Sequence, residues 1–338
     1  MTKTLLAVDG NSLLHRSFHA LAGTELRTRD GRPTWAVKGA LSQILGAVDR
    51  VAADAVVIGF DDARSSRRKA AHPHYKAHRT DKHADLVTQL ALAVDVFGAA
   101  GLHVVTPEGF EADDVLASAA SVATEAGWHT VVCTSDRDAF ALITETTSVL
   151  RIINGGVEAS PVLTPARLRI LLGIDPWQYR QYAAMRGDAS DNLTGIRGIG
   201  EKTGVALLNA FGSVEAAFAD VDTNDGARVA EVLGKACVKK LADADGRAAF
   251  WQNLELMTMR TDLDLGLGLG AKAGRGVLPV DAQVLHDALA EMELHSLQWL
   301  ASRVLTSGAD GAPGAVVARA PAPVRAPAAA IEDELTLF

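Results

Sequence analysis

The first half of the chain alternates between short apolar runs and longer stretches in which apolar residues recur every three or four positions. The short runs predict buried β-strands, and the recurring pattern predicts amphipathic helices. The predicted strands are residues 5–8, 55–60, 102–105 and 129–134, and the predicted helices are residues 35–51, 86–97, 111–125 and 137–142. Strands that alternate with helices are typical of an α/β fold. We therefore expect a mostly parallel sheet flanked by helices within residues 1–164.

The pattern changes after residue 164. Apolar residues keep a helical spacing to about residue 304, with Gly and Pro between the helices, which predicts an α-helical lobe over residues 165–304. Ala, Pro and Gly then dominate residues 305–330, which predicts a disordered linker. Residues 331–338 are acidic and apolar again. We therefore expect two folded units followed by a tethered tail.

Acidic side chains gather in five clusters, four of which follow an apolar run or lie at the start of a predicted helix. The carboxyl ends of parallel strands meet at one edge of a sheet, so these side chains can converge. Carboxylates in one place repel each other unless cations neutralise them. Oxygen ligands without a Cys or His set favour Mg²⁺ or Mn²⁺, and two such ions about 4 Å apart hydrolyse phosphodiesters by in-line displacement. The candidate ligands are Asp9, Asp61, Glu111, Asp113, Asp114, Asp136, Asp138, Asp188 and Asp191.

Composition agrees with a globular enzyme. Of the 338 residues 48% are hydrophobic, yet the longest apolar runs are far shorter than the roughly 20 residues that span a bilayer. The first residues enter a predicted strand with no signal peptide, so we expect a cytoplasmic protein without a membrane partner. The two cysteines, Cys133 and Cys237, allow neither a disulfide framework nor a zinc knuckle, which agrees with a reducing compartment.

The net charge of −8 argues against a nucleic-acid ligand, but the charges are unevenly placed. Residues 64–83 carry seven Lys or Arg side chains and a single acid, Asp81. Such a stretch is either a solvated charged loop or a surface that binds phosphates. Its position between Asp61 and the predicted helix at residue 86 favours the binding of nucleic acid.

A glycine-rich loop at residues 195–204 opens a predicted helix at residues 201–211. Gly198 and Gly200 allow backbone angles closed to other residues and a close approach to a ligand. The N–H groups at the helix start, together with Arg197 and Lys202, then offer positive charge to a phosphate. The loop resembles a helix-hairpin-helix element, which grips the backbone of duplex DNA without sequence readout. A dinucleotide-binding loop is the alternative, although no predicted strand precedes this one.

Six motifs occur in the order that they have in the bacterial 5′ nucleases, a family that includes the N-terminal domain of DNA polymerase I and the flap endonucleases. They are the hairpin loop and residues 9–11 (DGN), 60–61 (FD), 111–114 (EADD), 134–138 (TSDRD) and 187–192 (GDASDN). The resemblance covers about residues 3–300. It implies a PIN-like 5′ nuclease core, a helical arch at about residues 63–97 and a helix-hairpin-helix lobe. No polymerase domain follows, so we expect a stand-alone 5′-3′ exonuclease and flap endonuclease.

The resemblance also implies a role for each matching residue. The ion nearer the scissile phosphate would be held by Asp9, Asp61, Glu111 and Asp113, and the second ion by Asp136, Asp138, Asp188 and Asp191. Asp114 would hold or orient either ion through water. Arg68 and Lys69 would assist catalysis. The DNA contacts would be Arg16, Arg67, Tyr75, Lys76, Arg79, Arg197, Gly198, Gly200 and Lys202. A potassium ion at the hairpin loop is expected in addition.

The expected arch is a basic channel for a single-stranded 5′ end, in which Tyr75 can stack on a base. Two residues depart from the family pattern. Arg67 stands where the family often has Phe, and Lys38 stands where it often has Tyr. Charge therefore replaces base stacking near the expected cut site, and the preferred cleavage position does not follow from the sequence.

Three functions fit these features. The first is a monomeric enzyme that cuts DNA at 5′ flaps, nicks or free 5′ ends in Okazaki-fragment processing and repair, and the complete set of carboxylates favours it. The second is a non-catalytic scaffold that binds branched DNA at replication forks. The third is a metal-dependent phosphatase or small-nucleotide hydrolase, which would need neither the arch nor the hairpin loop.

The tail has a pattern of its own. Residues 334–338 (ELTLF) place apolar side chains after a polar linker, and an apolar patch without a core to join needs a partner. The segment resembles the pentapeptide, commonly Gln-Leu-x-Leu-Phe, by which bacterial replication proteins bind the sliding clamp. Leu335, Leu337 and Phe338 would fill the clamp pocket, with Glu334 replacing the Gln. The linker would then raise the local concentration of the nuclease at the clamp.

Overall fold

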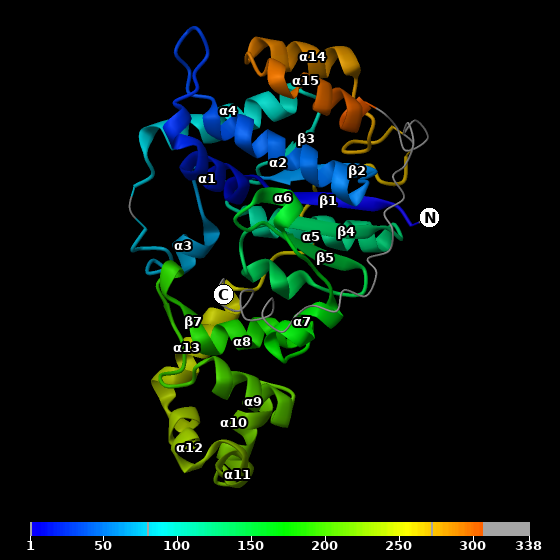
Figure 1. The fold of residues 1–338 in the computed structure, drawn as a ribbon. Coiled ribbons are helices and arrows are strands. Elements are labelled where there is room, and N and C mark those ends of the chain that lie inside the picture. The colour runs from blue at the N-terminus through cyan, green and yellow to red at the C-terminus, as the bar shows by residue number, and fades with distance from the viewer. Residues whose placement is uncertain (1, 80, 272, 307–338) are drawn as a thin grey trace.

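The computed structural model describes residues 2–79, 81–271 and 273–306. Within these residues the centre of the molecule is a six-stranded sheet in the order β3-β2-β1-β4-β5-β6 (Figure 1). β1 to β5 pair in parallel, and β6 runs antiparallel to β5. The strands are β1 (Thr4–Asp9), β2 (Ala55–Gly59), β3 (His103–Val105), β4 (His129–Thr134), β5 (Thr147–Arg151) and β6 (Val162–Leu163). The α/β fold with a mostly parallel sheet is confirmed, although the apolar pattern had not singled out β5 and β6.

Helices cover both faces of this sheet, which explains why its strands are almost continuously apolar. Leu6 and Val8 of β1 point into one hydrophobic core, formed with α1, α2 and α4, whereas Leu5 and Ala7 point into the other, formed with α5 and the helical lobe. The helical segments of this part are α1 (Gly10–Leu21), η1 (Ala22–Thr24), α2 (Trp35–Val51), α3 (Arg67–Ala71), α4 (Ala84–Ala99), α5 (Ala112–Glu125), η2 (Asp138–Leu142) and α6 (Gly156–Ala159).

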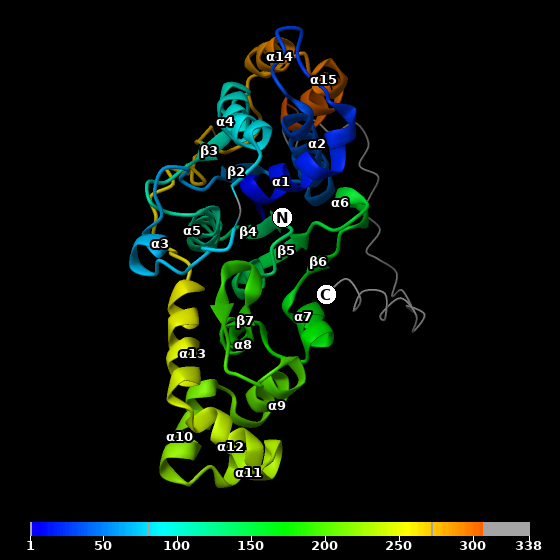
Figure 2. The ribbon, with the colours of Figure 1, turned by 90° about the vertical axis from the view of Figure 1, so that its left-hand side faces the viewer.

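A helical lobe lies below the sheet in Figures 1 and 2 and extends away from it. The two-stranded hairpin β7-β8 lies on the side of the lobe that faces the core. The elements of the lobe are α7 (Pro165–Leu172), η3 (Pro176–Gln178), α8 (Tyr179–Arg186), β7 (Gly187–Asp188), η4 (Ala189–Asp191), β8 (Leu193–Thr194), α9 (Glu201–Phe211), α10 (Val214–Thr223), α11 (Ala227–Leu233), α12 (Lys235–Ala242) and α13 (Ala244–Leu256).

The chain does not stay in the lobe to residue 304, which corrects the extent predicted from the helical spacing. After α13 it returns to the sheet without a helix, and Val277 forms a bridge to Ala55 of β2. Two helices, α14 (Ala282–Glu291) and α15 (His295–Ala301), then pack on α4 and α2. Their apolar residues belong to the same core as α1. Amphipathic spacing shows which side of a helix is buried but not which element covers it, so the sequence could not reveal this return.

The described chain ends in the short π-helix η5 (Ser302–Thr306), whose Leu305 is buried in the core beside α2. The folded part therefore extends into the first residues of the linker expected at 305–330. Most of that linker and the whole expected clamp-binding segment, with Leu335, Leu337 and Phe338, lie outside the described residues.

No single helix in the described ranges is long and apolar enough to cross a membrane. The pair α9 and α10, bent by 76° at its junction, reaches the necessary length and apolar content only when the two helices are taken together.

Candidate active site

The carboxyl ends of three neighbouring strands meet at one edge of the sheet. β1 ends at Asp9, Asp61 lies two residues beyond β2, and Asp136 lies two residues beyond β4. The start of α5 reaches the same edge, because the Ala112 N–H donates to the Asp61 Oδ1 at 2.9 Å. This places Asp113, in the first turn of α5, beside the strand ends. The structure thus brings together clusters that are far apart in the sequence.

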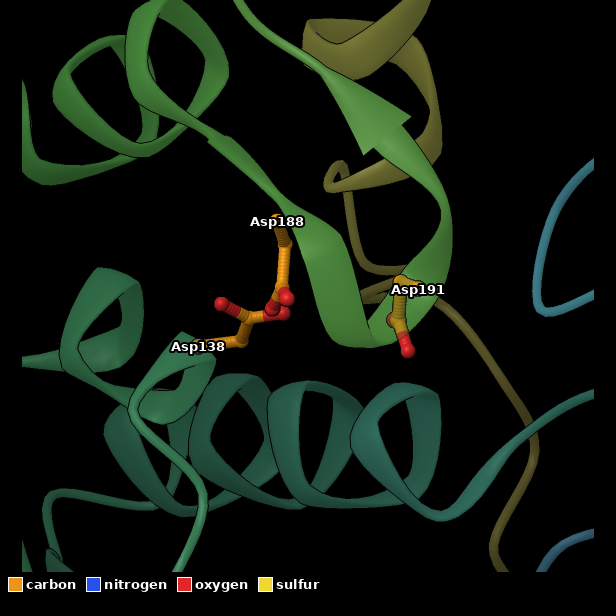
Figure 3. Close-up of side chains that lie close together, drawn as sticks. All are labelled: Asp138, Asp188 and Asp191. Atoms are coloured by element: carbon orange, nitrogen blue, oxygen red, sulfur yellow. The ribbon is translucent and has the colours of Figure 1, made fainter. Parts of the chain in front are cut away.

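The lobe supplies two further acids to this edge. Asp188 ends β7 and Asp191 ends η4, and both approach Asp138 of the core (Figure 3). One carboxylate oxygen from each of these three residues lies within 4.8 Å of the other two. In Figure 3 the side chains of Asp138 and Asp188 extend toward each other across the boundary between core and lobe. An oxygen-only group of this kind has the chemistry that hard divalent cations prefer.

Burial and the mutual repulsion of these carboxylates raise the pKa of several of them. Burial raises the pKa of Asp9 to about 7, and the charge of Asp136 adds to the rise. Burial likewise raises the pKa of Asp113 well above its usual value, with the charges of Asp136 and Asp9 contributing. The pKa of Asp138 is raised to about 7 by burial and by the charges of Asp136 and Asp188. Such a group is stabilised by bound cations, because they remove the repulsion.

Two of the acids are held in place by polar neighbours that the sequence analysis did not assign. Asn11 accepts a hydrogen bond from the Asp61 N–H at 2.9 Å and donates from its Nδ2 to the Asp61 Oδ2 at 3.1 Å. Asp9 accepts from the Ser12 N–H at 2.9 Å and from the Thr134 hydroxyl at 2.8 Å. The only signal in the sequence was the place of Asn11 and Thr134 inside the motifs DGN and TSDRD. Partners of this type fix the direction of a ligand's oxygen atoms.

Glu111 and Asp114 have a different environment, because cationic side chains surround them. Glu111 Oε2 accepts from Lys76 Nζ at 2.8 Å and from Arg68 Nη1 at 3.2 Å. Although burial raises it, the charge and hydrogen bond of Lys76 bring the pKa of Glu111 below its usual value. Asp114 accepts from Arg68 Nη2 at 2.7 Å and from the Arg260 N–H at 2.8 Å. Arg68, expected to assist catalysis, thus joins both acids.

The expected arch at residues 63–97 contains α3, a connecting segment and α4. Tyr75 differs from its expected role as a surface for base stacking: it is 6% exposed, and its hydroxyl donates to Glu111 Oε2 at 3.1 Å. Arg79 pairs with Asp191 at 2.5 Å. Arg67 places its guanidinium 4.4 Å from the centre of the Phe110 ring. Lys69 is exposed.

Outside the arch, Arg16 donates from its Nη2 to Asn154 Oδ1 at 2.7 Å. In the hairpin loop Gly198 and Gly200 are exposed. Gly198 has a φ of +80°, and its carbonyl accepts from Lys240 Nζ at 2.8 Å, a basic neighbour that the sequence analysis missed. Gly200 caps α9 without a side chain, and Arg197 and Lys202 beside it are exposed. The loop therefore presents backbone N–H groups and positive charge together, as phosphate binding requires.

Two family models match most of the described chain. The model of the 5′-3′ exonuclease N-terminal resolvase-like domain matches residues 4–169, and that of the 5′-3′ exonuclease C-terminal SAM fold matches residues 174–275. Their boundary falls between the α/β core and the helical lobe. The chain belongs to the 5′-3′ exonuclease family, which is a family of nucleases.

Among its relatives, the DNA polymerase I of Mycobacterium bovis is 37% identical over 219 residues, which are 65% of this chain and 24% of the relative. The chain thus spans about a quarter of the length of such relatives. The T5 D15 protein, co-crystallised with metal ions, has a TM-score of 0.61 at 19% identity and covers 86% of this chain and 99% of its own. The catalytic core of Rad2 in complex with DNA substrate has a TM-score of 0.54 at 16% identity, covering 90% and 91%. These two structures share the fold.

Proposed function

We propose that this chain is a structure-specific 5′-3′ exonuclease and 5′ flap endonuclease that hydrolyses DNA phosphodiesters with divalent ions. The observation that supports this proposal most directly is the meeting of Asp138 from the core with Asp188 and Asp191 from the lobe, within 4.8 Å. Relatives of this chain include DNA polymerase I, and we propose Okazaki-fragment processing and repair as the setting. DNA with 5′ flaps, nicks or free 5′ ends is the proposed substrate.

The donor set suits Mg²⁺ or Mn²⁺, because it consists of carboxylate oxygens whose mutual repulsion a cation relieves. Asp136, Asp138, Asp188 and Asp191 would hold one ion, and Asp9 and Asp113 would hold the other. When bound, two such ions supply hydroxide near neutral pH and stabilise the charge on the leaving 3′ oxygen.

In the remaining expected ligands, Asp61, Asp114 and Glu111, the carboxylate oxygens accept hydrogen bonds from other groups of the protein. Asn11 and the Ala112 N–H orient Asp61 for an ion of the pair. Arg68 and the Arg260 N–H hold Asp114, so we propose that Asp114 fixes the start of α5 and acts on an ion only through other groups. Direct binding of an ion by Glu111 stays a prediction.

DNA would be gripped at two places. The hairpin loop, with Arg197, Gly198, Gly200 and Lys202, would bind the duplex backbone through its exposed N–H groups and charges. Arch residues, among them Arg68 and Lys69, would contact the strand at the cut site, and Arg16 would reach a phosphate beyond it. The potassium ion at the hairpin loop and the binding of the sliding clamp by Leu335, Leu337 and Phe338 stay predictions from the sequence.

The test is cleavage of a 5′-labelled flap duplex with Mn²⁺ or Mg²⁺, with and without a chelator. We expect products only with the ion, and Asp136→Asn should cut at least about tenfold more slowly, which is about 1.4 kcal/mol of barrier. Binding of the same DNA should persist, because the hairpin loop is untouched. Asp95→Asn, an exposed residue of α4, is the matched control. Cleavage in chelator, or an Asp136→Asn rate near that of wild type, would contradict the proposal.

A further inference from the structure

One carboxylate oxygen of Glu111 collects three donors from the arch. Glu111 Oε2 accepts from Lys76 Nζ at 2.8 Å, from the Tyr75 hydroxyl at 3.1 Å and from Arg68 Nη1 at 3.2 Å. The other oxygen, Oε1, lies 3.4 Å from the Ser66 hydroxyl. All four donors come from residues 66–76. Three donors on one oxygen saturate its lone pairs, so this atom is committed to the arch.

The same segment also forms hydrogen bonds to the lobe. The Lys76 N–H donates to the Asp191 carbonyl at 2.9 Å, and Asn192 Nδ2 donates to the His74 carbonyl at 2.8 Å. The Tyr75 ring packs in a small apolar cluster with Leu193 of β8 and Leu256 of α13. In Figures 1 and 2 α3 accordingly lies above α13, and Figure 2 shows it beside α5. One short segment thus contacts both core and lobe.

Glu111 and Asp113 are two residues apart in the chain, yet the groups around their carboxylates carry different charges. Burial raises the pKa of Asp113, and the carboxylates of Asp136, Asp9 and Asp138 around it outweigh the opposing charge of Lys76, so that this pKa stays well above its usual value. Glu111 faces Lys76 and Arg68, so its charge is compensated within the protein. Adjacent acids in one motif therefore have different partners: Asp113 faces the acidic group and Glu111 faces the arch.

We propose that Glu111 is the anchor of the arch, and that Tyr75 and Lys76 are positioning residues that dock the arch at the edge of the acidic group through it. Tyr75 then acts through its hydroxyl and its buried ring, and not as an exposed surface for a base. The inference concerns the resting position of the arch and does not require that the chain cleave DNA, so its failure is distinguishable from that of the proposed function.

The docked arch has a consequence for a nucleic-acid strand entering the site. The cations that such a strand would meet, Lys76 and Arg68, are already paired with Glu111. Phosphates must compete with this carboxylate for the same ammonium and guanidinium groups. A weakened anchor would therefore leave the arch more mobile while freeing its positive charges.

Hydrogen exchange of the full chain, without DNA and in chelator, tests the anchor. Tyr75→Phe removes one hydroxyl and keeps the ring, so amides of residues 67–79 should exchange at least about tenfold faster while those of α5 stay protected. Lys76→Met should have the same effect, and Lys76→Arg should restore slow exchange because it retains the charge. Tyr182→Phe in α8 is the matched control for loss of a tyrosine hydroxyl and should leave the arch unchanged.

Glu111→Gln, which keeps the size of the side chain, should also release the arch, with Glu125→Gln at the far end of the same helix as its control. Combining Glu111→Gln with Tyr75→Phe should add little to the larger single effect, because both break one link. Unchanged exchange in Tyr75→Phe and Lys76→Met would overturn the proposal. So would a Glu111→Gln protein that loses affinity for Mn²⁺ in titration calorimetry while its arch stays protected.

Discussion

Replacing Asp138 by Asn should stabilise the protein in chelator, even though it removes an acid of the proposed active site. Burial and the charges of Asp136 and Asp188 raise the pKa of Asp138 from 3.8 to about 7. A carboxyl group whose pKa is higher in the folded state opposes folding once it ionises. Its penalty is absent below pH 3.8, grows as the pH rises and is complete above about pH 7.

The size of the effect follows from the same values. A tenfold change in proton affinity is about 1.4 kcal/mol, so a rise from 3.8 to about 7 sets an upper bound of about 4 kcal/mol. The Asp138 side chain is partly exposed, and solvent screening reduces the repulsion. We therefore expect a gain of about 1–2 kcal/mol in the free energy of unfolding, or a rise of roughly 2–4 °C in Tm.

Thermal unfolding of wild type and Asp138→Asn at pH 8 and pH 4, each in chelator and in Mn²⁺, provides the assay. The variant should melt higher than wild type in chelator at pH 8, and the difference should shrink toward pH 4. Mn²⁺ should raise the Tm of wild type more than that of the variant, which lacks a ligand oxygen. Asp95→Asn controls for loss of an exposed charge. An Asp138→Asn protein that melts at or below the wild-type temperature at pH 8 would refute the repulsion argument.

Two further predictions concern the hairpin loop and the positioning of Asp61. Arg197→Ala combined with Lys202→Ala should weaken duplex binding and flatten its salt dependence, because each lost phosphate contact means that about one counterion fewer is released. Binding titrations at about 50 to 200 mM salt test this. An unchanged slope of affinity against salt concentration would exclude these contacts. Asn11→Ala should raise the Mn²⁺ concentration for half-maximal cleavage by about 10–100-fold at unaltered duplex affinity, and a normal Mn²⁺ titration would mean that Asn11 does not position Asp61.

The apolar pattern and the acidic motifs predicted the sheet and the acidic edge well, because both depend on short stretches of consecutive residues. A parallel strand must be apolar on both faces, and its carboxyl end must meet its neighbours' ends, so Asp9, Asp61 and Asp136 could be placed from their positions after apolar runs. β5 was missed because Thr147, Ser148 and Arg151 leave only two apolar residues in the strand, although all of its residues are buried in the structure.

The partners of the acids could not be predicted in this way. Glu111 and Asp113 are equivalent by type and spacing, yet one meets Lys76 and the other meets Asp136. This difference arises from how the segment after α3 folds back, which depends on contacts with the lobe. The burial of Tyr75 has the same origin, since a basic stretch with one aromatic residue gives no sign of the apolar cluster that receives the ring.

The return of the chain from α13 to the sheet makes the lobe an insertion that is joined to the core at both of its ends. A unit on a single tether can swivel about that tether, whereas two separated attachments leave only a hinge about the line between them. Asn253 ties α13, the last helix before the return, to the rest of the lobe, because its Nδ2 donates to the carbonyls of Ala184 and Thr194. A duplex held on the hairpin loop would consequently meet the acidic edge at a set angle. The distance from a DNA end to the cut would then be determined by the separation between the hairpin loop and the acidic edge.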